Sequence, residues 1–174
     1  MPAKQLTDNI FREPFWLALA MLAIAGAAIL GALGFQHLGG YQPCALCLMQ
    51  RTPYYVGIPL LVMVGTAALA GGQRAVIATL FGLFAALMLY NAGLAAYHAG
   101  VEWRFWEGPA SCAPSVGVDN AADMLNQLQN MHAPSCTDAT WRLLGLSFAG
   151  WNVLISVLLA GLGAFAAAAS LRRA

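Results

Sequence analysis

Four long stretches without a charged residue dominate this sequence of 174 amino acids. Each is 17 to 23 residues long, and they cover residues 15–35, 54–70, 75–97 and 148–169. The eight basic and seven acidic residues of the chain all lie outside them. About 20 apolar residues in a helix cross the roughly 30 Å hydrocarbon core of a bilayer, where every backbone group must be paired internally. The four stretches therefore predict four transmembrane helices.

The composition excludes an ordinary water-soluble protein. Hydrophobic residues make up 60% of the chain and charged residues only 9%, whereas an average soluble domain is about one quarter charged. The net charge of +1 and the single lysine also argue against a nucleic-acid partner, which requires clustered positive charge. We therefore expect one all-α membrane domain over residues 1–174, built as a four-helix bundle.

The basic residues set the expected orientation of this bundle. With four spans, both termini lie on one side of the membrane, and that side collects Lys4, Arg12, Arg74, Arg172 and Arg173. The other side holds only Arg51, Arg104 and Arg142. The positive-inside rule then places both termini in the cytoplasm. The loops at residues 36–53 and 98–147 would face the periplasm of a bacterial inner membrane, where disulfides persist.

The first of these loops carries a Cys-x-x-Cys motif, formed by Cys44 and Cys47. If the second helix begins at Pro43, both sulfurs and the Arg51 guanidinium share one face of its first turns. A helix N-terminus and a nearby cation both favour the thiolate. If the helix begins instead at Pro53, the two cysteines lie in an irregular turn. The sequence leaves both starts open.

Three kinds of site use a Cys-x-x-Cys motif. A zinc site needs a second pair of ligands at a suitable spacing, and the sequence offers none, so we expect no metal. A structural disulfide across so short a loop would constrain the unfolded chain little. A redox-active dithiol is the best interpretation, because a thiolate is the nucleophile in disulfide exchange.

The second loop contains Cys112 and Cys136, which are flanked by prolines and small residues. Such sequences are typical of exposed, mobile backbone. Taken alone, the pair would be interpreted as a structural bridge, but the dithiol motif on the same side favours a redox role. A short amphipathic helix is expected between the two cysteines, either on the membrane surface or packed on neighbouring segments. Its apolar face would hold Met124, Leu128 and Met131.

Several other residues at the outer side are candidates for binding or anchoring. Arg51 could extend its charge to the lipid headgroups, but its spacing from the cysteines favours contact with an anionic or carbonyl-bearing group. His98 and His37 lack helical histidine partners that would suggest a haem or metal, and interfacial histidines commonly just form hydrogen bonds. An aromatic belt at the outer interface is predicted from Trp103, Phe105, Trp106, Trp141 and Trp151.

These motifs together resemble the DsbB family of bacterial disulfide bond formation proteins, over essentially the whole chain. The resemblance rests on the four spans and on Phe35-Gln36-His37, Pro43-Cys44-x-x-Cys47-x-x-Gln50-Arg51, Tyr97-His98, the Cys112 and Cys136 pair, and Trp141-x-x-Leu144-Gly145-Leu146-x4-Trp151. The motifs occur in the right order and on the right side of the membrane.

The resemblance implies an oxidoreductase that reoxidises a DsbA-like periplasmic protein of thioredoxin fold. It also implies the disulfides Cys44–Cys47 and Cys112–Cys136. A thiolate of the partner would attack Cys112, and the freed Cys136 would open the other disulfide at Cys44. Cys47 would then be the thiolate beside a quinone, and would pass two electrons to it.

The electron acceptor implied by the resemblance is ubiquinone, or menaquinone when oxygen is low. Arg51 would hold the quinone, and His98 is a second contributor. Two alternatives remain at this point. One is a non-catalytic four-helix membrane protein with two structural disulfides, and the other is a paralogue that serves a dedicated partner.

Overall fold

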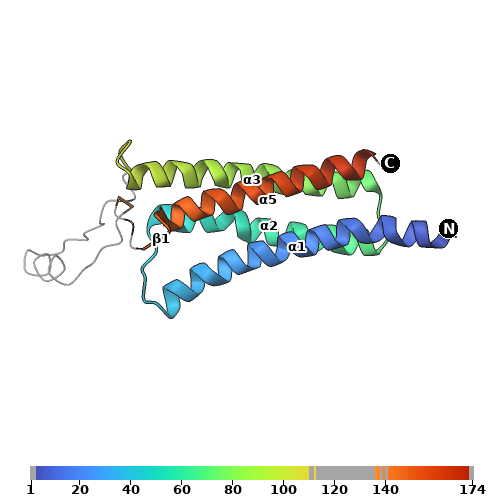
Figure 1. Ribbon diagram of the computed structural model, residues 1–174, viewed down its shortest axis with the longest axis horizontal. Helices are drawn as coiled ribbons and strands as arrows, with labels where there is room; N and C mark the ends of the chain where they lie inside the picture. The colour runs from blue at the N-terminus through green and yellow to red at the C-terminus, as the bar shows by residue number, and fades with distance from the viewer. Residues whose placement is uncertain (1–2, 110–111, 113–135, 138, 140, 173–174) are drawn as a thin grey trace, which may run out of the picture.

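The structure is a computed structural model that describes residues 3–109, 112, 136–137, 139 and 141–172. Four long helices and one small hairpin account for its regular elements (Figure 1). The helices are α1 (Ala3–His37), α2 (Ala45–Leu69), α3 (Arg74–Glu102) and α5 (Phe148–Arg172), and the strands are β1 (Arg142–Leu143) and β2 (Leu146–Ser147). The amphipathic helix expected around Leu128 falls outside the described residues.

All four helices are long and apolar enough to cross a membrane, with candidate spans of 24 to 29 residues. Many of their large apolar side chains point outward: Leu30, Leu89 and Phe165 are 65% to 70% exposed. Such a surface is suited to lipid and not to water. The predicted all-α fold with four membrane helices is confirmed, and the chain is a multi-pass membrane protein.

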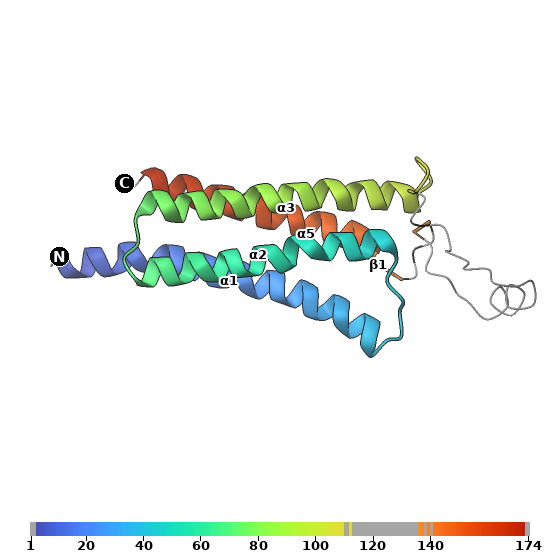
Figure 2. The same ribbon diagram turned by 180° about the vertical axis from the view of Figure 1, so that it is seen from behind.

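The helices run side by side, with α3 packed along α5 and α1 along α2. Both ends of the described chain lie at one end of the bundle (Figure 1). The α1–α2 connection and the hairpin lie at the opposite end, which we call the cysteine end because all four cysteines are in segments that begin or finish there (Figure 2). Towards the cysteine end, α1 diverges from α2 and α5 in both views.

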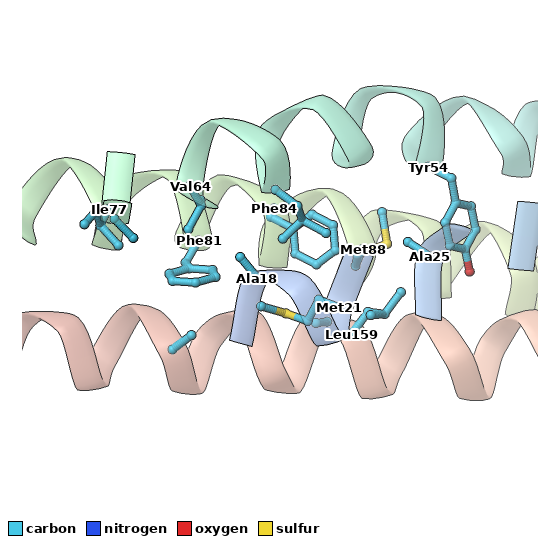
Figure 3. Packing of buried hydrophobic residues seen from close by; sticks show 14 of the residues in the cluster. Ala18, Met21, Ala25, Tyr54, Val64, Ile77, Phe81, Phe84, Met88 and Leu159 are labelled. Carbon is cyan, nitrogen blue, oxygen red and sulfur yellow. The ribbon is translucent and has the colours of Figure 1, made fainter. Parts of the chain in front are cut away.

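A core of apolar side chains fills the middle of the bundle (Figure 3). Met21, Phe81, Phe84, Met88 and Leu159 are fully buried there. Small residues bring α3 and α5 close together, because a Cβ atom at Gly163 would lie only 3.1 Å from that of Ala85. Close backbone approach of this kind is typical of membrane helices.

Two helices extend beyond the charge-free stretches that predicted them. The second helix begins at Ala45, not at residue 54, because Cys44 caps its first turn and Pro53 lies inside it. Charge alone marked the wrong boundary, since Arg51 lies inside the helix. Similarly α3 continues to Glu102, so His98 is a helical residue and not the first residue of a loop.

The hairpin before α5 was not predicted. Its strands pair antiparallel, with Arg142 opposite Ser147 and Leu143 opposite Leu146. Both turn residues have positive φ angles, 53° at Leu144 and 83° at Gly145. Positive φ at both central residues is the type I′ geometry that suits two-residue hairpins. The hairpin sets the position at which α5 begins.

Candidate functional site

The Cys-x-x-Cys motif forms the first turn of α2. Cys44 is the N-cap residue, and its Sγ accepts a hydrogen bond of 3.2 Å from the backbone N–H of Cys47. The two sulfurs lie 2.8 Å apart. The observed start of α2 at Ala45 is thus closer to the start expected at Pro43 than to the one at Pro53.

The two cysteine pairs differ in oxidation state. Cys112 and Cys136 form a disulfide with a Cα–Cα distance of 5.5 Å, whereas Cys44 and Cys47 are free thiols. The expected disulfide between Cys44 and Cys47 is thus not formed in this structure, and its formation in the oxidised protein stays a prediction. The short sulfur–sulfur distance shows that the pair needs little movement to form it.

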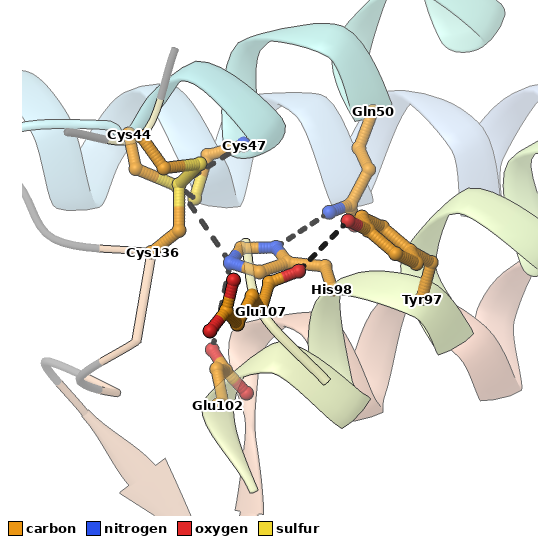
Figure 4. The surroundings of a disulfide bond; sticks show 9 residues. Cys44, Cys47, Gln50, Tyr97, His98, Glu102, Glu107 and Cys136 are labelled. Carbon is orange, nitrogen blue, oxygen red and sulfur yellow. Dashed lines mark hydrogen bonds and ion pairs between the residues drawn. A yellow bond between two sulfur atoms is a disulfide. The ribbon is translucent and has the colours of Figure 1, made fainter. Parts of the chain in front are cut away.

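The disulfide lies next to Cys44 (Figure 4). Cys44 and Cys136 are buried in one small cluster with Leu46 and Val101. Their exposed fractions are 4% and 1%, and Cys47 and Cys112 pack at the margin of this cluster. The fold therefore brings together two cysteines that are 92 positions apart in the sequence.

The surroundings of Cys44 favour its thiolate. The hydrogen bond from the Cys47 thiol is the largest influence, and it lowers the pKa of the Cys44 thiol from 9.0 to about 4. The imidazole of His98 acts in the same direction, with Nε2 3.7 Å from the Cys44 sulfur. Burial opposes both effects, because it disfavours the charged form of the thiol.

His98 on α3 is buried at the centre of the polar part of the site. Its Nδ1 lies 2.7 Å from Nε2 of Gln50. Its Nε2 faces both Cys44 and the carboxylate of Glu102, whose Oε1 is 3.9 Å away. Ser147 of β2 donates a hydrogen bond to the other oxygen of Glu102. The hairpin thus helps to hold Glu102 beneath His98.

A cavity of about 260 Å³ opens beside the dithiol, between the diverging end of α1 and helices α2 and α5. Its walls are mainly apolar and aromatic, including Phe35, Phe148 and Trp151. Of the described cysteines, Cys47 lines it. The polar groups of its wall are Gln36, Tyr41, Gln42, Gln50, Arg51, Tyr54, His98 and Asn152.

Arg51 and His98, the two residues expected to bind the acceptor, both line this cavity. Nη1 of Arg51 donates a hydrogen bond of 2.5 Å to Oε1 of Gln36 at the end of α1. The guanidinium is therefore held across the cavity by a neighbouring helix. His37 is exposed and is not among the residues that form the wall.

The sequence interpretation missed a cluster of uncharged polar residues deeper in the bundle. Asn152 is at its centre, with its Oδ1 2.7 Å from the hydroxyl of Tyr54 and its Nδ2 2.6 Å from Oε1 of Gln50. Asn91 and Ser156 are fully buried beside it and share a hydrogen bond of 2.9 Å. Polar groups inside a membrane span are costly. A search of the spans for uncharged polar residues, and not only for charges, would have found them.

The predicted aromatic belt divides into two groups. Trp103, Phe105 and Trp106 follow α3 and are 48% to 67% exposed. Trp141 instead stacks on Phe148, with ring centroids 4.9 Å apart. Phe148 and Trp151 line the cavity, so the second group, Trp141 and Trp151, belongs to the surroundings of the cavity.

Three potential metal ligands, Cys44, Cys47 and His98, have their ligand atoms within 4.8 Å of one another. Two thiolates on one tetrahedral zinc ion, each about 2.3 Å from it, would be about 3.8 Å apart. The observed distance of 2.8 Å is too short for two sulfur ligands of one zinc ion.

Comparison with known proteins relates the chain to one family. The family model "Disulfide bond formation protein DsbB" matches residues 13–166. A protein of Polaromonas sp. named "Disulfide bond formation protein B" is 32% identical over 149 residues, which are 83% of this chain and 86% of the relative. Proteins of the same name from Dechloromonas aromatica and Marinobacter nauticus are 32% and 28% identical, over 87% and 86% of this chain and 88% and 89% of their own lengths. No solved structure matches the chain at a significant level.

Proposed function

Because this chain belongs to the DsbB family of membrane disulfide bond formation proteins, we propose that it oxidises a DsbA-like periplasmic dithiol protein and passes the electrons to a membrane quinone. One observation carries the proposal. The Cys112–Cys136 disulfide packs against Cys44, whereas Cys47 lines the cavity. The two cysteines of the motif thus serve different partners.

The exchange on the outer side uses Cys112 first. A thiolate of the partner attacks its sulfur, the Cys112–Cys136 bond breaks, and Cys136 leaves as a thiolate. Cys136 then attacks Cys44 in the oxidised motif, and Cys47 leaves as a thiolate. The burial of Cys136 beside Cys44 supports this choice of sulfur, because exchange requires direct contact between the attacking thiolate and the disulfide.

Two further exchanges complete the oxidation of the partner. Its second thiolate attacks its own sulfur in the mixed disulfide and releases Cys112. Cys112 then attacks Cys136 and releases Cys44 as a thiolate. The products are an oxidised outer pair and a reduced Cys44–Cys47 pair, which are the oxidation states of this structure. The groups that lower the pKa of Cys44 make it a good leaving group in the last step.

The cavity residues fit a quinone ring. The cavity has a volume of about 260 Å³, just below the range of about 300–1,000 Å³ for pockets that enclose a drug-sized ligand. This volume leaves room for one ring. Its aromatic walls suit a flat ring, and the donors Arg51 and His98 suit carbonyl oxygens. We propose ubiquinone as the acceptor, with menaquinone in its place when oxygen is low.

A bound quinone supplies an acceptor for two electrons and two protons. The residues of the chain have distinct roles in delivering them. Cys47 is the sulfur nearest the acceptor, Arg51 orients the ring, and His98 stabilises the Cys44 thiolate from the other side. Cys44 and Cys47 lose two electrons as their disulfide forms again, and of the two protons that the acceptor takes up, one comes from the Cys47 thiol and one from water.

The proposed location is a bacterial inner membrane, with the cysteine end in the periplasm and both termini in the cytoplasm. The excess of basic residues near the termini supports this orientation. The disulfide at the cysteine end supports it as well, because disulfides persist in an oxidising compartment.

Quinone reduction by the purified protein tests the function. The full chain in detergent is mixed with a reduced thioredoxin-fold partner and a ubiquinone analogue, and quinone absorbance is followed with time. We expect quinone loss in proportion to partner oxidation. A chain with two purely structural disulfides would consume no quinone, so a lack of consumption with the wild-type protein would reject the proposal.

A further inference from the structure

A chain of hydrogen bonds leads from the interior of the bundle to the reactive cysteines. It begins at the hydroxyl of Tyr54, which donates to Oδ1 of Asn152 at 2.7 Å. Nδ2 of Asn152 donates to Oε1 of Gln50 at 2.6 Å. Nε2 of Gln50 then lies 2.7 Å from Nδ1 of His98 (Figure 4). The chain crosses from α2 to α5, back to α2, and on to α3.

Each link in this chain determines the direction of the next. An amide side chain has a donor end and an acceptor end. Since Oδ1 of Asn152 accepts from Tyr54, its Nδ2 is the group that donates to Gln50. Gln50 therefore turns its own Nε2 towards His98, and Nδ1 of His98 must accept. A neutral imidazole that accepts at Nδ1 carries its proton on Nε2.

That proton faces the reactive pair of cysteines. Nε2 of His98 is 3.7 Å from the Cys44 sulfur, within reach of a hydrogen bond to a thiolate. With the opposite tautomer, an unprotonated Nε2 would face the sulfur, and its lone pair would disfavour the thiolate. The direction of the chain therefore decides whether His98 helps or hinders Cys44.

The anchor of the chain is well supported. Ser156 donates to Oδ1 of Asn152 at 3.3 Å, and Asn91 donates to Ser156 at 2.9 Å. Gln50 is only 5% exposed and Tyr54 only 3%. Buried polar groups in membrane spans are costly and are retained for function. The hydrogen bonds of these residues lead to His98, so a role in holding His98 accounts for them better than a direct role in exchange.

We propose that Asn152 and Gln50 are positioning residues that fix His98 with its proton on Nε2 and thereby stabilise the Cys44 thiolate. The inference deepens the proposed function, since it rests on the use of that thiolate in exchange. The other titratable groups that face this site are Cys47 of α2 and Glu102 of α3, and the charge of Arg142 acts on Glu102. Substitution of Asn152 leaves all three groups in place.

The pH dependence of Cys44 alkylation tests this inference without a partner or a quinone. The full chain is prepared with Cys44 and Cys47 reduced and the outer disulfide intact. Iodoacetamide labelling of Cys44 is then quantified by peptide mass across the pH range. We expect Asn152→Leu and Gln50→Leu to raise the labelling midpoint by about one pH unit. With a wild-type midpoint of about 4, such a shift means that either variant is labelled about fivefold less than the wild type at pH 4.

Ile155→Ala is the matched control, because Ile155 lines the same cavity from α5 through an apolar side chain. We expect its midpoint to be that of the wild type. A midpoint unchanged in Asn152→Leu would overturn the inference, and so would an equal shift in Ile155→Ala. If Asn152→Leu does not fold, Tyr54→Phe removes a single oxygen and must shift the midpoint in the same direction.

Nitrogen NMR of labelled histidine provides the second readout. In a His37→Gln, His132→Gln background, His98 is the remaining histidine of the three in the chain. We expect the signals of a neutral imidazole protonated at Nε2, and their replacement by a tautomer mixture in Asn152→Leu. The Nδ1-protonated tautomer in the starting protein would overturn the inference. Loss of quinone reduction with a normal tautomer and midpoint would reject the proposed function alone.

Discussion

Cys44 and Cys47, three positions apart in the chain, face two different parts of the site. Cys44 is buried with Cys136 of the outer disulfide, whereas Cys47 lines the cavity between α1, α2 and α5. The two thiols can face different parts of the site because Cys44 is the N-cap residue and Cys47 lies inside the first turn of α2. The motif thereby connects a soluble dithiol partner to a cavity within the bundle.

The cavity-facing position of Cys47 predicts that its loss stops electron transfer to quinone. Cys47→Ser leaves the outer disulfide and the Cys44 sulfur in place but removes the sulfur nearest the acceptor. We expect quinone reduction, followed by absorbance, to fall to the uncatalysed rate. Measurable turnover in this variant would contradict the mechanism, and a normal Cys112–Cys136 disulfide by peptide mass would show that the variant is folded.

The outer pair predicts a trapped intermediate. In Cys136→Ser, Cys112 is a free thiol, and when the oxidised partner is added it attacks the partner's disulfide and releases one of the partner's thiolates. The partner should then remain attached to Cys112, because Cys136 is not present to re-form the outer disulfide and displace it. We expect a covalent adduct on a non-reducing gel that disappears after reduction. Cys112→Ser is the matched control and should form much less adduct. If Cys112→Ser forms the adduct in equal yield, through Cys136, the assigned order of attack is wrong.

The contact between Arg51 and Gln36 predicts a role in acceptor binding. Removal of a charged hydrogen-bond donor costs about 1.5–3 kcal/mol, so Arg51→Ala should raise the apparent KM for quinone by about tenfold or more. Formation of the mixed disulfide with the partner, seen on a non-reducing gel, should be unaffected. Arg104→Ala, at an exposed position after α3, serves as the control. An unchanged KM in Arg51→Ala would indicate that Arg51 contacts lipid headgroups and does not bind the quinone.

The environment of Cys44 predicts reactivity in acid. Its pKa lies near 4 in place of 9.0, so iodoacetamide should label it at pH 5 to 6, where an ordinary thiol is protonated. Because the folded-state pKa is depressed, the stabilisation that the thiolate gives the reduced protein is complete above pH 9. It declines as the pH falls and is lost at about pH 4.

The Cys47 thiol makes the largest contribution to this shift. Cys47→Ala should therefore raise the labelling midpoint of Cys44 more than His98→Ala does. Midpoints are read from labelling rates across the pH range. The opposite order of the two variants would show that the imidazole, and not the neighbouring thiol, is the main cause.

The sequence predicts the membrane fold well because the absence of charge is a property of each residue and needs no tertiary information. It predicts helix ends less well. Arg51 and Glu102 lie inside helices that continue past the apolar stretches, since a charge at the membrane surface does not end a helix. Cys44 as the cap of α2 was also not predicted, because capping by a thiol has a weaker signal than capping by a hydroxyl or carboxylate.

The cysteines, Arg51 and His98 were identified from motifs that are local in sequence. The chain from Tyr54 through Asn152 to Gln50 was not, because its links join residues 98 and 102 positions apart. Only the packing of α3 against both α2 and α5 brings these polar groups together. Uncharged polar residues in apolar stretches were a signal, but their partners could be known only from the structure.

The close packing of α3 and α5 predicts a stability difference between two glycines of α5. A Cβ at Gly163 would lie 3.1 Å from the Cβ of Ala85 and 3.3 Å from backbone atoms of α3, whereas a Cβ at Gly161 would have nothing within 4 Å. Overpacking costs about 1–3 kcal/mol, so Gly163→Leu should lower the thermal unfolding midpoint in detergent. Gly161→Leu should not lower it, because its side chain extends into lipid or detergent. Equal midpoints in the two variants would show that α3 and α5 are held less closely than the structure indicates.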